Sequence, residues 1–161
     1  MDGRFPVIAR IQVRWRDIDP LGHVNNAVYF TYFETARARY YEEVLDARGI
    51  EDIDFLVASI RCDYLSPVVY GETVEVGIRV VWVGKTSWSF EYEARTGDGR
   101  VVARADSVQV RFDHQTGRPR PLDEDWIARV TRAQGGPPAP KPNDGPESGE
   151  PAPHAVTGER R

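Results

Sequence analysis

The residues best suited to chemistry stand together just before a predicted helix. Asp17 and Asp19 are followed by a proline, a glycine and His23, and the helical pattern begins a few residues later. The first turn of a helix offers backbone N–H groups that lack intrahelical partners, together with the positive end of the helix dipole. A carboxylate beside such a helix start can act as base or nucleophile on a carbonyl group that the N–H groups polarise. This arrangement suits the hydrolysis of an activated acyl bond.

The same residues also fit a purely structural role. The stretch from Asp19 to Gly22 has the composition of an ordinary turn, and Asp17 can cap that turn or pair with Arg14 or Arg16. Spacing alone therefore leaves both interpretations open.

The helix after this stretch has a wide apolar surface. We expect Asn25 or Asn26 to be its N-cap, the helix to run to about Leu45, and Arg48-Gly49 to close it. At about 100° per residue, its apolar side chains cover an arc of roughly 220°, wider than the stripe of a helix that lies on a sheet face. We infer that other elements wrap the helix.

The rest of the body has the two-residue period of strands. Alternating apolar and polar residues predict strands over residues 7–15, 55–64, 73–82, 88–95 and 101–112, and residues 121–132 predict a short closing helix. Long strands joined by tight turns form an antiparallel sheet with one apolar face. One apolar helix and one curled sheet make an α+β fold in which the sheet wraps the helix.

Composition changes at residue 135. Residues 135–161 hold 7 Pro and 5 Gly and no aromatic residue. Such a segment cannot bury enough apolar surface to offset the entropy of ordering it. We therefore expect one domain over residues 1–134 and a disordered tail over residues 135–161.

Charge and composition exclude several classes of function. The chain carries 21 basic and 25 acidic residues, a formal net charge of −4, which is the wrong sign for binding nucleic-acid phosphates. No apolar run approaches the ~20 residues of a membrane span, and nothing resembles a signal peptide, so we expect a cytoplasmic protein. The single cysteine, Cys62, excludes an internal disulfide, and no ligand cluster predicts a metal ion or another cofactor.

Three motifs share their pattern with a known family. They are DIDPLGHVNN over residues 17–26, YFTYFETAR over residues 29–37 and SPVVYGE over residues 66–72. With these motifs the chain resembles the acyl-CoA thioesterases of the hotdog fold, most of all the 4-hydroxybenzoyl-CoA thioesterase family. The match covers about residues 8–113. A hotdog fold is a long helix wrapped by an antiparallel sheet, which is the shape that the periodicity also requires.

The resemblance implies roles for the residues of the motif. Asp19 matches the catalytic aspartate of that family, as nucleophile or as general base, and the backbone N–H near Asn26 would polarise the thioester carbonyl. The implied substrate-binding residues are His23, Asn25, Asn26, Lys85, Thr86 and Ser87. In related enzymes the site forms across a dimer and basic residues hold the CoA phosphates, so Lys85 is the local candidate for that contact.

The sequence thus predicts a homo-oligomer, a dimer or tetramer, that hydrolyses acyl-CoA thioesters to free carboxylic acid and CoA without a cofactor. Two alternatives stay open: a thioesterase for acyl groups on an acyl carrier protein, and a non-catalytic acyl-CoA-binding module. Glu34, about two turns into the helix, is a further carboxylate, but we expect it to pair with Arg37 or Arg39.

Overall fold

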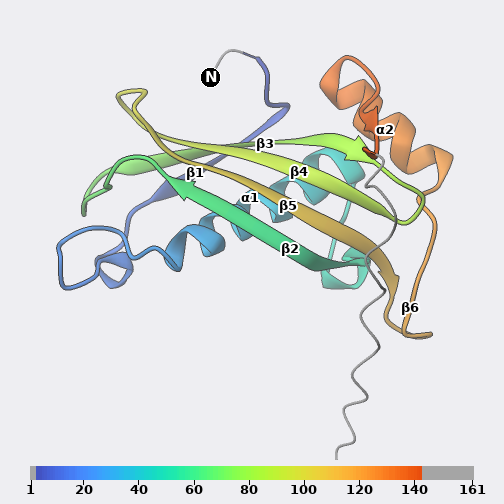
Figure 1. The fold of residues 1–161 in the computed structure, drawn as a ribbon, viewed down its shortest axis with the longest axis horizontal. Helices are drawn as coiled ribbons and strands as arrows, with labels where there is room; N and C mark the ends of the chain where they lie inside the picture. The colour runs from blue at the N-terminus through green and yellow to red at the C-terminus, as the bar shows by residue number, and fades with distance from the viewer. Residues whose placement is uncertain (1–2, 143–161) are drawn as a thin grey trace, which may run out of the picture.

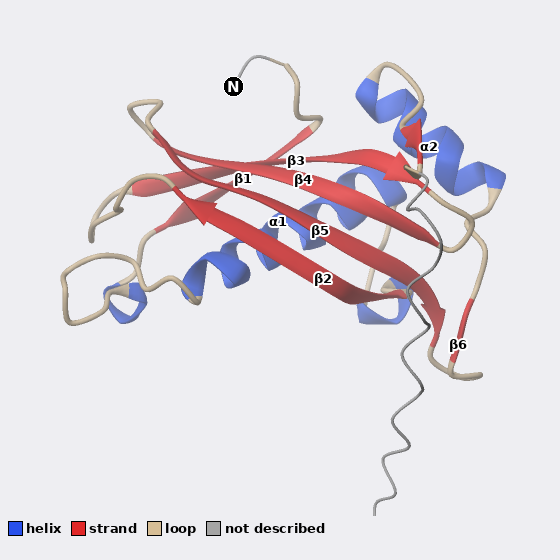
Figure 2. Cartoon of the chain, viewed as in Figure 1, coloured by secondary structure: helices blue, strands red, loops and turns tan. Residues whose placement is uncertain are grey.

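The sheet of this protein curls around one long helix. The structure, a computed structural model, describes residues 3–142 of the chain. Five strands form an antiparallel sheet in the order β1-β3-β4-β5-β2, and helix α1 (Val28–Leu45) lies along its concave face (Figures 1 and 2). The strands are β1 Val7–Gln12, β2 Phe55–Tyr64, β3 Thr73–Val83, β4 Ser87–Thr96 and β5 Val101–Asp113.

Shorter elements flank this unit. The 3-10 helices η1 (Trp15–Asp17) and η2 (Ile50–Asp52) precede and follow α1. Helix α2 (Glu124–Gln134) packs at the end of the sheet where β3 turns into β4, which we call the far end. Strand β6 (Arg118–Pro119) pairs with β5, and β7 (Ala139–Pro140) runs parallel to the end of β3. Within residues 3–142, no helix is both long and apolar enough to span a membrane.

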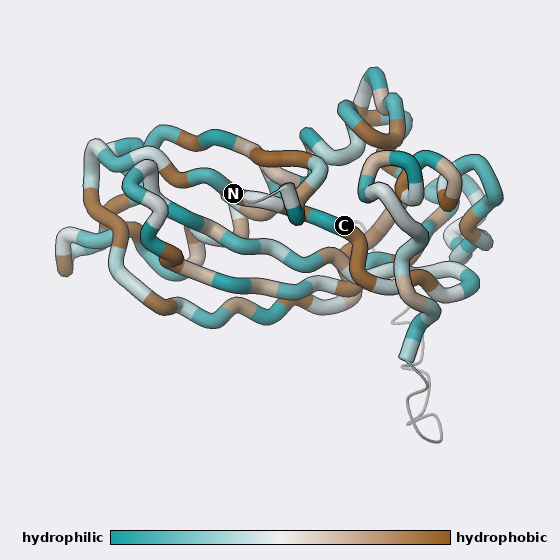
Figure 3. The backbone as a smooth tube through the Cα atoms, turned by 90° about the horizontal axis from the view of Figure 1, so that it is seen from above, coloured by the Kyte–Doolittle hydropathy of each residue, from teal (hydrophilic) through white to brown (hydrophobic). Residues whose placement is uncertain are grey.

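The inward faces of the strands form the core. Hydrophilic and hydrophobic residues alternate along the strands (Figure 3), as the period of two predicts. The buried hydrophobic residues of β3 and β4 are Val74, Val76, Ile78, Val80, Trp88, Phe90, Tyr92 and Ala94. Residues of α1 fill the space above them, with Tyr32, Phe33, Ala36 and Tyr40 at most 1% exposed.

The opposite sector of α1 faces solvent. It consists of Thr31, Glu34, Thr35, Ala38 and Glu42, all exposed. The predicted wrapping of the helix and the predicted α+β class are therefore confirmed.

Helix α1 ends at Leu45, as predicted, but the residues that close it are different. Asp46, with φ of 59°, is the left-handed residue that was expected at Gly49. The N–H groups of Asp46 and Ala47 both donate to the Tyr41 carbonyl, which closes the helix directly after its last turn. Aspartate tolerates this conformation because its short polar side chain can bond locally.

The N-terminal cap also differs from the prediction. The N-cap residue is Ala27, without a side-chain cap, and the Asn25 side chain accepts the Ala27 N–H instead. Similarly, β1 ends at Gln12, because the chain turns into η1 at Trp15 instead of continuing as a strand.

The first residues of the expected tail are ordered. Lys141 N–H donates to the Val83 carbonyl (2.8 Å), and the Lys141 ammonium lies 5.8 Å from the centre of the Trp82 ring. Residues 135–142 thus depart from the predicted disorder, because β3 extends beyond β1 and leaves a strand edge that β7 can pair with. The remainder of the predicted tail, residues 143–161, lies outside the described residues.

Candidate active site

Backbone hydrogen bonds close the loop between η1 and α1 on itself. The Asp19 N–H donates to the His23 carbonyl (2.8 Å), and the Gly22 N–H donates to the Asp19 carbonyl (3.0 Å). Gly22 has a φ of +81°, a conformation that residues with a side chain rarely adopt. The Val24 N–H donates to the Val68 carbonyl (2.8 Å), which ties the loop to the segment before β3.

Asp17 is the buried structural carboxylate of this loop. Its side chain accepts hydrogen bonds from the Arg14 side chain and backbone and from the Tyr32 hydroxyl (2.9 Å), and Asp17 is only 2% exposed. Burial alone would raise the pKa of Asp17, but the hydrogen bonds from Arg14 and Tyr32 outweigh it and hold that pKa below its usual range. The prediction that Asp17 pairs with Arg14 or Arg16 is confirmed for Arg14.

Asp19 is the carboxylate that the loop leaves available. Its Oδ1 atom accepts the Leu21 N–H (2.8 Å) and, at longer range, the His23 N–H (3.4 Å). Across residues 3–142 no donor is bonded to Oδ2, and the side chain is partly exposed. The carboxylate lines an open groove of about 440 Å³. The other lining residues are Val24, Asn26, Tyr29, Tyr64, Leu65, Ser66 and Pro67.

The start of α1 reaches the same groove. Asn25 organises this start, because its Oδ1 accepts the Ala27 N–H (2.9 Å) and its carbonyl accepts the Val28 N–H (3.0 Å). The Asn26 N–H has no acceptor within the described part of the chain. Asn26 lies directly before the N-cap of this 18-residue helix, and an unpaired N–H near the positive end of a helix is a favourable place for developing negative charge.

Tyr64 is a residue of this groove that the sequence reasoning missed. Its hydroxyl donates to the Asn26 carbonyl (2.9 Å), and its ring packs edge-on against Tyr29 at 5.2 Å. Burial raises the pKa of Tyr64 further above neutral pH, where a tyrosine hydroxyl is already a protonated donor. The signal was its place at the end of the strand predicted over residues 55–64, directly before the Ser66-Pro67 break.

Arg100 holds in place the part of the groove that Ser66 and Pro67 line. Arg100 donates to the Ser66 hydroxyl (2.8 Å) and to the Pro67 carbonyl (2.6 Å), and it forms an ion pair with Glu72 (2.6 Å). These contacts therefore hold the segment before β3 beside the groove that Asp19 lines.

The other predicted contacts divide between two places. His23 lies exposed on the Asp19 loop. Lys85, Thr86 and Ser87 lie at the β3–β4 turn, at the other end of the sheet (Figure 1). The 11 residues of β3 separate that turn from the groove, which at ~3.3 Å per residue is about 30 Å or more. One chain therefore does not bring Lys85 to Asp19.

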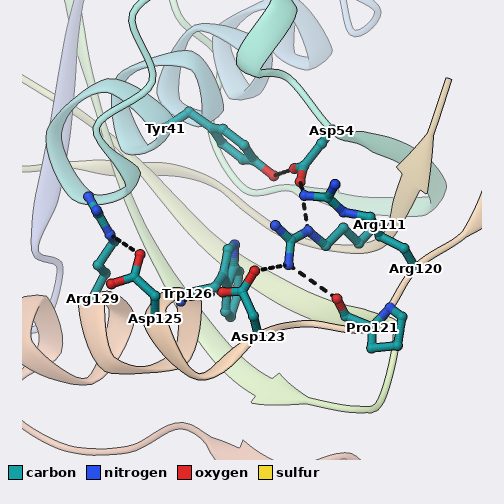
Figure 4. A network of polar contacts seen from close by, with 9 residues as sticks. All are labelled: Tyr41, Asp54, Arg111, Arg120, Pro121, Asp123, Asp125, Trp126 and Arg129. Atoms are coloured by element: carbon teal, nitrogen blue, oxygen red, sulfur yellow. Dashed lines mark hydrogen bonds and ion pairs between the residues drawn. The ribbon is translucent and has the colours of Figure 1, made fainter. Parts of the chain in front are cut away.

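A charged hollow lies at this far end, between α1, α2 and β5 (Figure 4). The Arg111 guanidinium donates to Asp54 (2.6 Å) and to Asp123 (2.7 Å), and Asp54 also pairs with Arg120 (3.1 Å). Tyr41 of α1 donates to Asp54 as well (3.4 Å). Asp54 and Asp123 are engaged with arginines, so this network clamps elements of the fold together.

Neither end of the sheet gathers the ligands of a metal centre. Within residues 3–142, no group of three or more His, Cys, Asp or Glu side chains is placed to hold a metal ion.

Comparisons with known proteins assign the chain and its fold to a family. The family model of the thioesterase-like superfamily matches residues 13–130. This chain therefore belongs to the thioesterase-like superfamily, a class of thioester hydrolases, and the predicted hotdog fold is confirmed.

Particular relatives agree with this assignment. A thioesterase from Thermus thermophilus, solved with coenzyme A and zinc, is 40% identical, with a TM-score of 0.77 and coverage of 85% of this chain and 99% of that one. The acyl-CoA thioester hydrolase YbgC of Escherichia coli is 24% identical over 78% of this chain and 92% of its own length. The uncharacterised protein YsmA of Bacillus subtilis is 27% identical over 71% of this chain and 78% of its own length.

Proposed function

We propose that this protein hydrolyses acyl-CoA thioesters to a free carboxylic acid and CoA in the groove that Asp19 lines. One observation carries the proposal: an aspartate with a free Oδ2 and a helix start with a free Asn26 N–H line the same open groove within the described residues. The relatives named as acyl-CoA thioester hydrolase and as a thioesterase with bound coenzyme A support CoA as the carrier.

The thioester carbonyl would lie against the start of α1. Its oxygen would accept the Asn26 N–H, which stabilises the negative charge that develops when the carbonyl carbon is attacked. Asp19 would either attack that carbon directly or take a proton from an attacking water. In both routes the C–S bond breaks, CoA leaves as its thiol, and water supplies the oxygen of the acid.

Side chains around the groove would hold these groups in place. Tyr64 fixes the Asn26 carbonyl, and Asn25 fixes the first N–H groups of the helix. Tyr29, 3% exposed, forms the floor against which the first carbons of the acyl group would lie. His23 would contact the CoA arm at the rim.

The CoA phosphates require cations, and we propose that a second copy of the chain supplies them. Lys85, with Thr86 and Ser87, is about 30 Å or more from the groove of its own chain. These residues approach Asp19 only if a homo-oligomer places the far end of one sheet beside the groove of another.

The test is thiol release from a panel of short, long, branched and aromatic acyl-CoAs. Wild type is compared with Asp19→Asn and with Glu42→Gln, an exposed carboxylate on α1 outside the groove. We expect Asp19→Asn to lose at least ~100-fold in kcat, about 2.7 kcal/mol of transition-state stabilisation, and Glu42→Gln to match wild type.

Other results would redirect the proposal. Turnover of acyl groups on carrier protein, without turnover of acyl-CoAs, would change the carrier. Tight CoA binding with no turnover of either substrate would indicate a binding module and overturn the enzymatic proposal.

A further inference from the structure

Arg37 is a buried cation without a counter-charge among the described residues. It is 9% exposed, and its Nη1 donates to the Tyr92 hydroxyl (3.2 Å). That hydroxyl lies 2.7 Å from the hydroxyl of Ser107, which in turn accepts from the amide of Gln109. These partners are all neutral, and no carboxylate within residues 3–142 forms an ion pair with Arg37. Because burying a guanidinium is unfavourable unless an anion compensates it, Arg37 is suited to bind an anionic group of a ligand.

The carboxylate one turn earlier on α1 does not supply this charge. Glu34 is exposed and forms no ion pair among the described residues. The predicted pairing of Glu34 with Arg37 or Arg39 was wrong: Arg37 turns inward to Tyr92, and Arg39 pairs with Glu43 (3.8 Å). The charge of Arg37 therefore stays uncompensated on its own helix.

Two nitrogens of the Arg37 side chain stay accessible. Within residues 3–142, Nε and Nη2 donate to no acceptor, and neither is among the fully buried polar atoms that lack a hydrogen-bond partner. Both atoms therefore reach the molecular surface, although most of the side chain is buried. A planar guanidinium with free donors along one edge matches the two oxygens of a carboxylate.

The register of the sheet gives the position of Arg37 relative to β2. Tyr92 stands level with Cys62, because both pair with the same residue of β5, and Ser107 pairs with Ile60. Arg37 is bonded to Tyr92. Its guanidinium group therefore lies near the level of Cys62 and Ile60 along β2.

This level is a short distance from the groove of Asp19. Tyr64 lines the groove, and Cys62 and Ile60 precede it by two and four residues on the same face of β2. At ~3.3 Å per residue, they are about 7–13 Å from Tyr64 along the strand. An acyl chain of medium length that begins at the groove can therefore end at Arg37.

The surface between the groove and Arg37 is apolar and only partly covered. The two β2 residues just named and Phe30 of α1 pack against the core and remain half-buried. Phe30 and Arg37 are seven residues apart, which places them on the same face of the helix. Tyr41, four residues further on, packs its ring on Phe55 of β2 with the ring centres 4.9 Å apart, so this face is directed at β2. An alkyl chain can follow it.

We propose that Arg37 binds a carboxylate at the end of the acyl group, so that the substrates are ω-carboxyacyl-CoAs, the CoA thioesters of dicarboxylic acids. The thioester would lie at Asp19 and Asn26, the alkyl chain along Phe30 and β2, and the terminal carboxylate against Nε and Nη2 of Arg37. Hydrolysis consumes one water and releases the dicarboxylic acid and the CoA thiol. The inference rests on the proposed function and adds the class of acyl group.

The test compares acyl-CoAs of matched length with and without a terminal carboxylate. The pairs are adipyl- and hexanoyl-CoA, suberyl- and octanoyl-CoA, and sebacyl- and decanoyl-CoA, and the readout is thiol release. In at least one pair we expect wild type to favour the ω-carboxyacyl-CoA by at least about 10-fold in kcat/KM, because charge-assisted hydrogen bonds are strong. We expect malonyl-CoA to gain nothing over propionyl-CoA, because its carboxylate ends before Arg37.

Variants of two arginines on α1 assign the preference to one of them. Arg37→Met is expected to remove the preference, whereas Arg37→Lys, which keeps the charge, is expected to retain part of it. Arg39→Met, at an exposed arginine on another face of the helix, is the matched control and is expected to keep the wild-type preference. The ratio of two kcat/KM values within one preparation does not change if a variant merely loses part of its folded population.

Two results would overturn the inference. The first is that wild type hydrolyses the unsubstituted acyl-CoA of every pair with an equal or higher kcat/KM. The second is that Arg37→Met keeps the wild-type preference, in which case another group recognises the carboxylate.

Binding separates a failure of this inference from a failure of the proposed function. If wild type releases thiol from no acyl-CoA, the proposed hydrolysis fails, and isothermal titration with suberyl-CoA and octanoyl-CoA then decides the inference. Tighter binding of suberyl-CoA that Arg37→Met abolishes would support carboxylate recognition by Arg37. Equal affinities for the two thioesters, or no binding of either, would overturn it.

Discussion

The carboxylates at the two ends of the sheet differ in how far they are paired: Asp54 and Asp123 at the far end are bonded to arginine, and Asp19, at the near end beside the groove, is bonded to none within the described residues. At the far end, Asp54 and Asp123 are each bonded to Arg111, and α2 starts on Asp123 (Figure 4). At the near end, Asp19 keeps one carboxylate oxygen without a donor from residues 3–142 and lines an open groove. A fully paired network stabilises the fold, whereas an unpaired acid beside free N–H groups is available for chemistry.

The near end repeats this contrast within three residues. Asp17 is buried and paired, and it anchors η1 to α1 through Tyr32, while Asp19 lies in the groove. The paired aspartate holds the loop in the shape that leaves its neighbour free. Structure and reactivity are thus divided between two residues of the same type.

The largest expected effect on stability is at the far end. Arg111→Ala removes the charge-assisted hydrogen bonds to two carboxylates that remain partly exposed to solvent, and it is expected to lower the free energy of unfolding by about 3 kcal/mol. Urea unfolding measures this loss, with Arg118→Ala on the exposed strand β6 as control. If the two variants are equally stable, the Arg111 network does not hold these elements together.

Acid should weaken both ends. Burial alone would raise the pKa of Asp17, but the hydrogen bonds from Arg14 and Tyr32 lower it more. The pKa of Asp123 is lowered mainly by the hydrogen bond from the Trp126 N–H and, after that, by the one from Arg111. Because both folded-state pKa values lie below the ordinary value, the unfolded chain takes up these protons first as the pH falls. We expect the free energy of unfolding to decrease below about pH 4. Asp123→Asn is expected to have a shallower decrease, and a wild-type stability that stays constant as the pH falls from neutral to about 3 would contradict this.

A smaller effect is expected from Tyr64→Phe. The variant loses one hydrogen bond to the Asn26 carbonyl, about 1 kcal/mol, and is expected to lower kcat about fivefold with little change in melting temperature. Steady-state kinetics with the best acyl-CoA measures it. Tyr70→Phe, at an exposed tyrosine outside the groove, serves as control, and an unchanged kcat for Tyr64→Phe would remove Tyr64 from the positioning of the helix start.

The smallest effect is expected from shortening the chain. Ending the chain after Pro142 keeps β7, and we expect an unchanged melting temperature. Ending it after Gly136 removes the Lys141–Val83 hydrogen bond and the contact with Trp82, about 1 kcal/mol, which lowers the melting temperature by a few degrees. If the chain that ends after Gly136 has the higher melting temperature of the two, β7 does not stabilise β3.

The fold could be predicted because each element has its own period. The strand over residues 55–64 was predicted with its observed bounds, and the wide apolar arc of α1 required a wrapping sheet. The residue that closes α1 was missed, because local hydrogen bonding decides which residue takes the left-handed conformation. Asp46 satisfies the Tyr41 carbonyl three residues before the expected glycine.

The site could be predicted less completely, because pairing in space decides it. The sequence places Asp17 and Asp19 in one motif, but Arg14 and Tyr32 determine which of them is buried. Lys85 was grouped with Asp19 by family resemblance, and the length of β3 separates them within one chain. Residues 84–87 can join the groove of Asp19 only through association, which periodicity does not report.

The most direct test measures kcat and the free energy of unfolding on the same preparations of Asp19→Asn and Asp17→Asn. We predict that Asp19→Asn loses at least ~100-fold in kcat and less than about 0.5 kcal/mol in stability. We predict that Asp17→Asn loses about 2 kcal/mol in stability, because it weakens a buried charge-assisted network, while the folded protein keeps kcat within about 10-fold of wild type. If Asp19→Asn turns over at the wild-type rate, or if the two variants lose the same stability, the division of roles between the two aspartates is wrong.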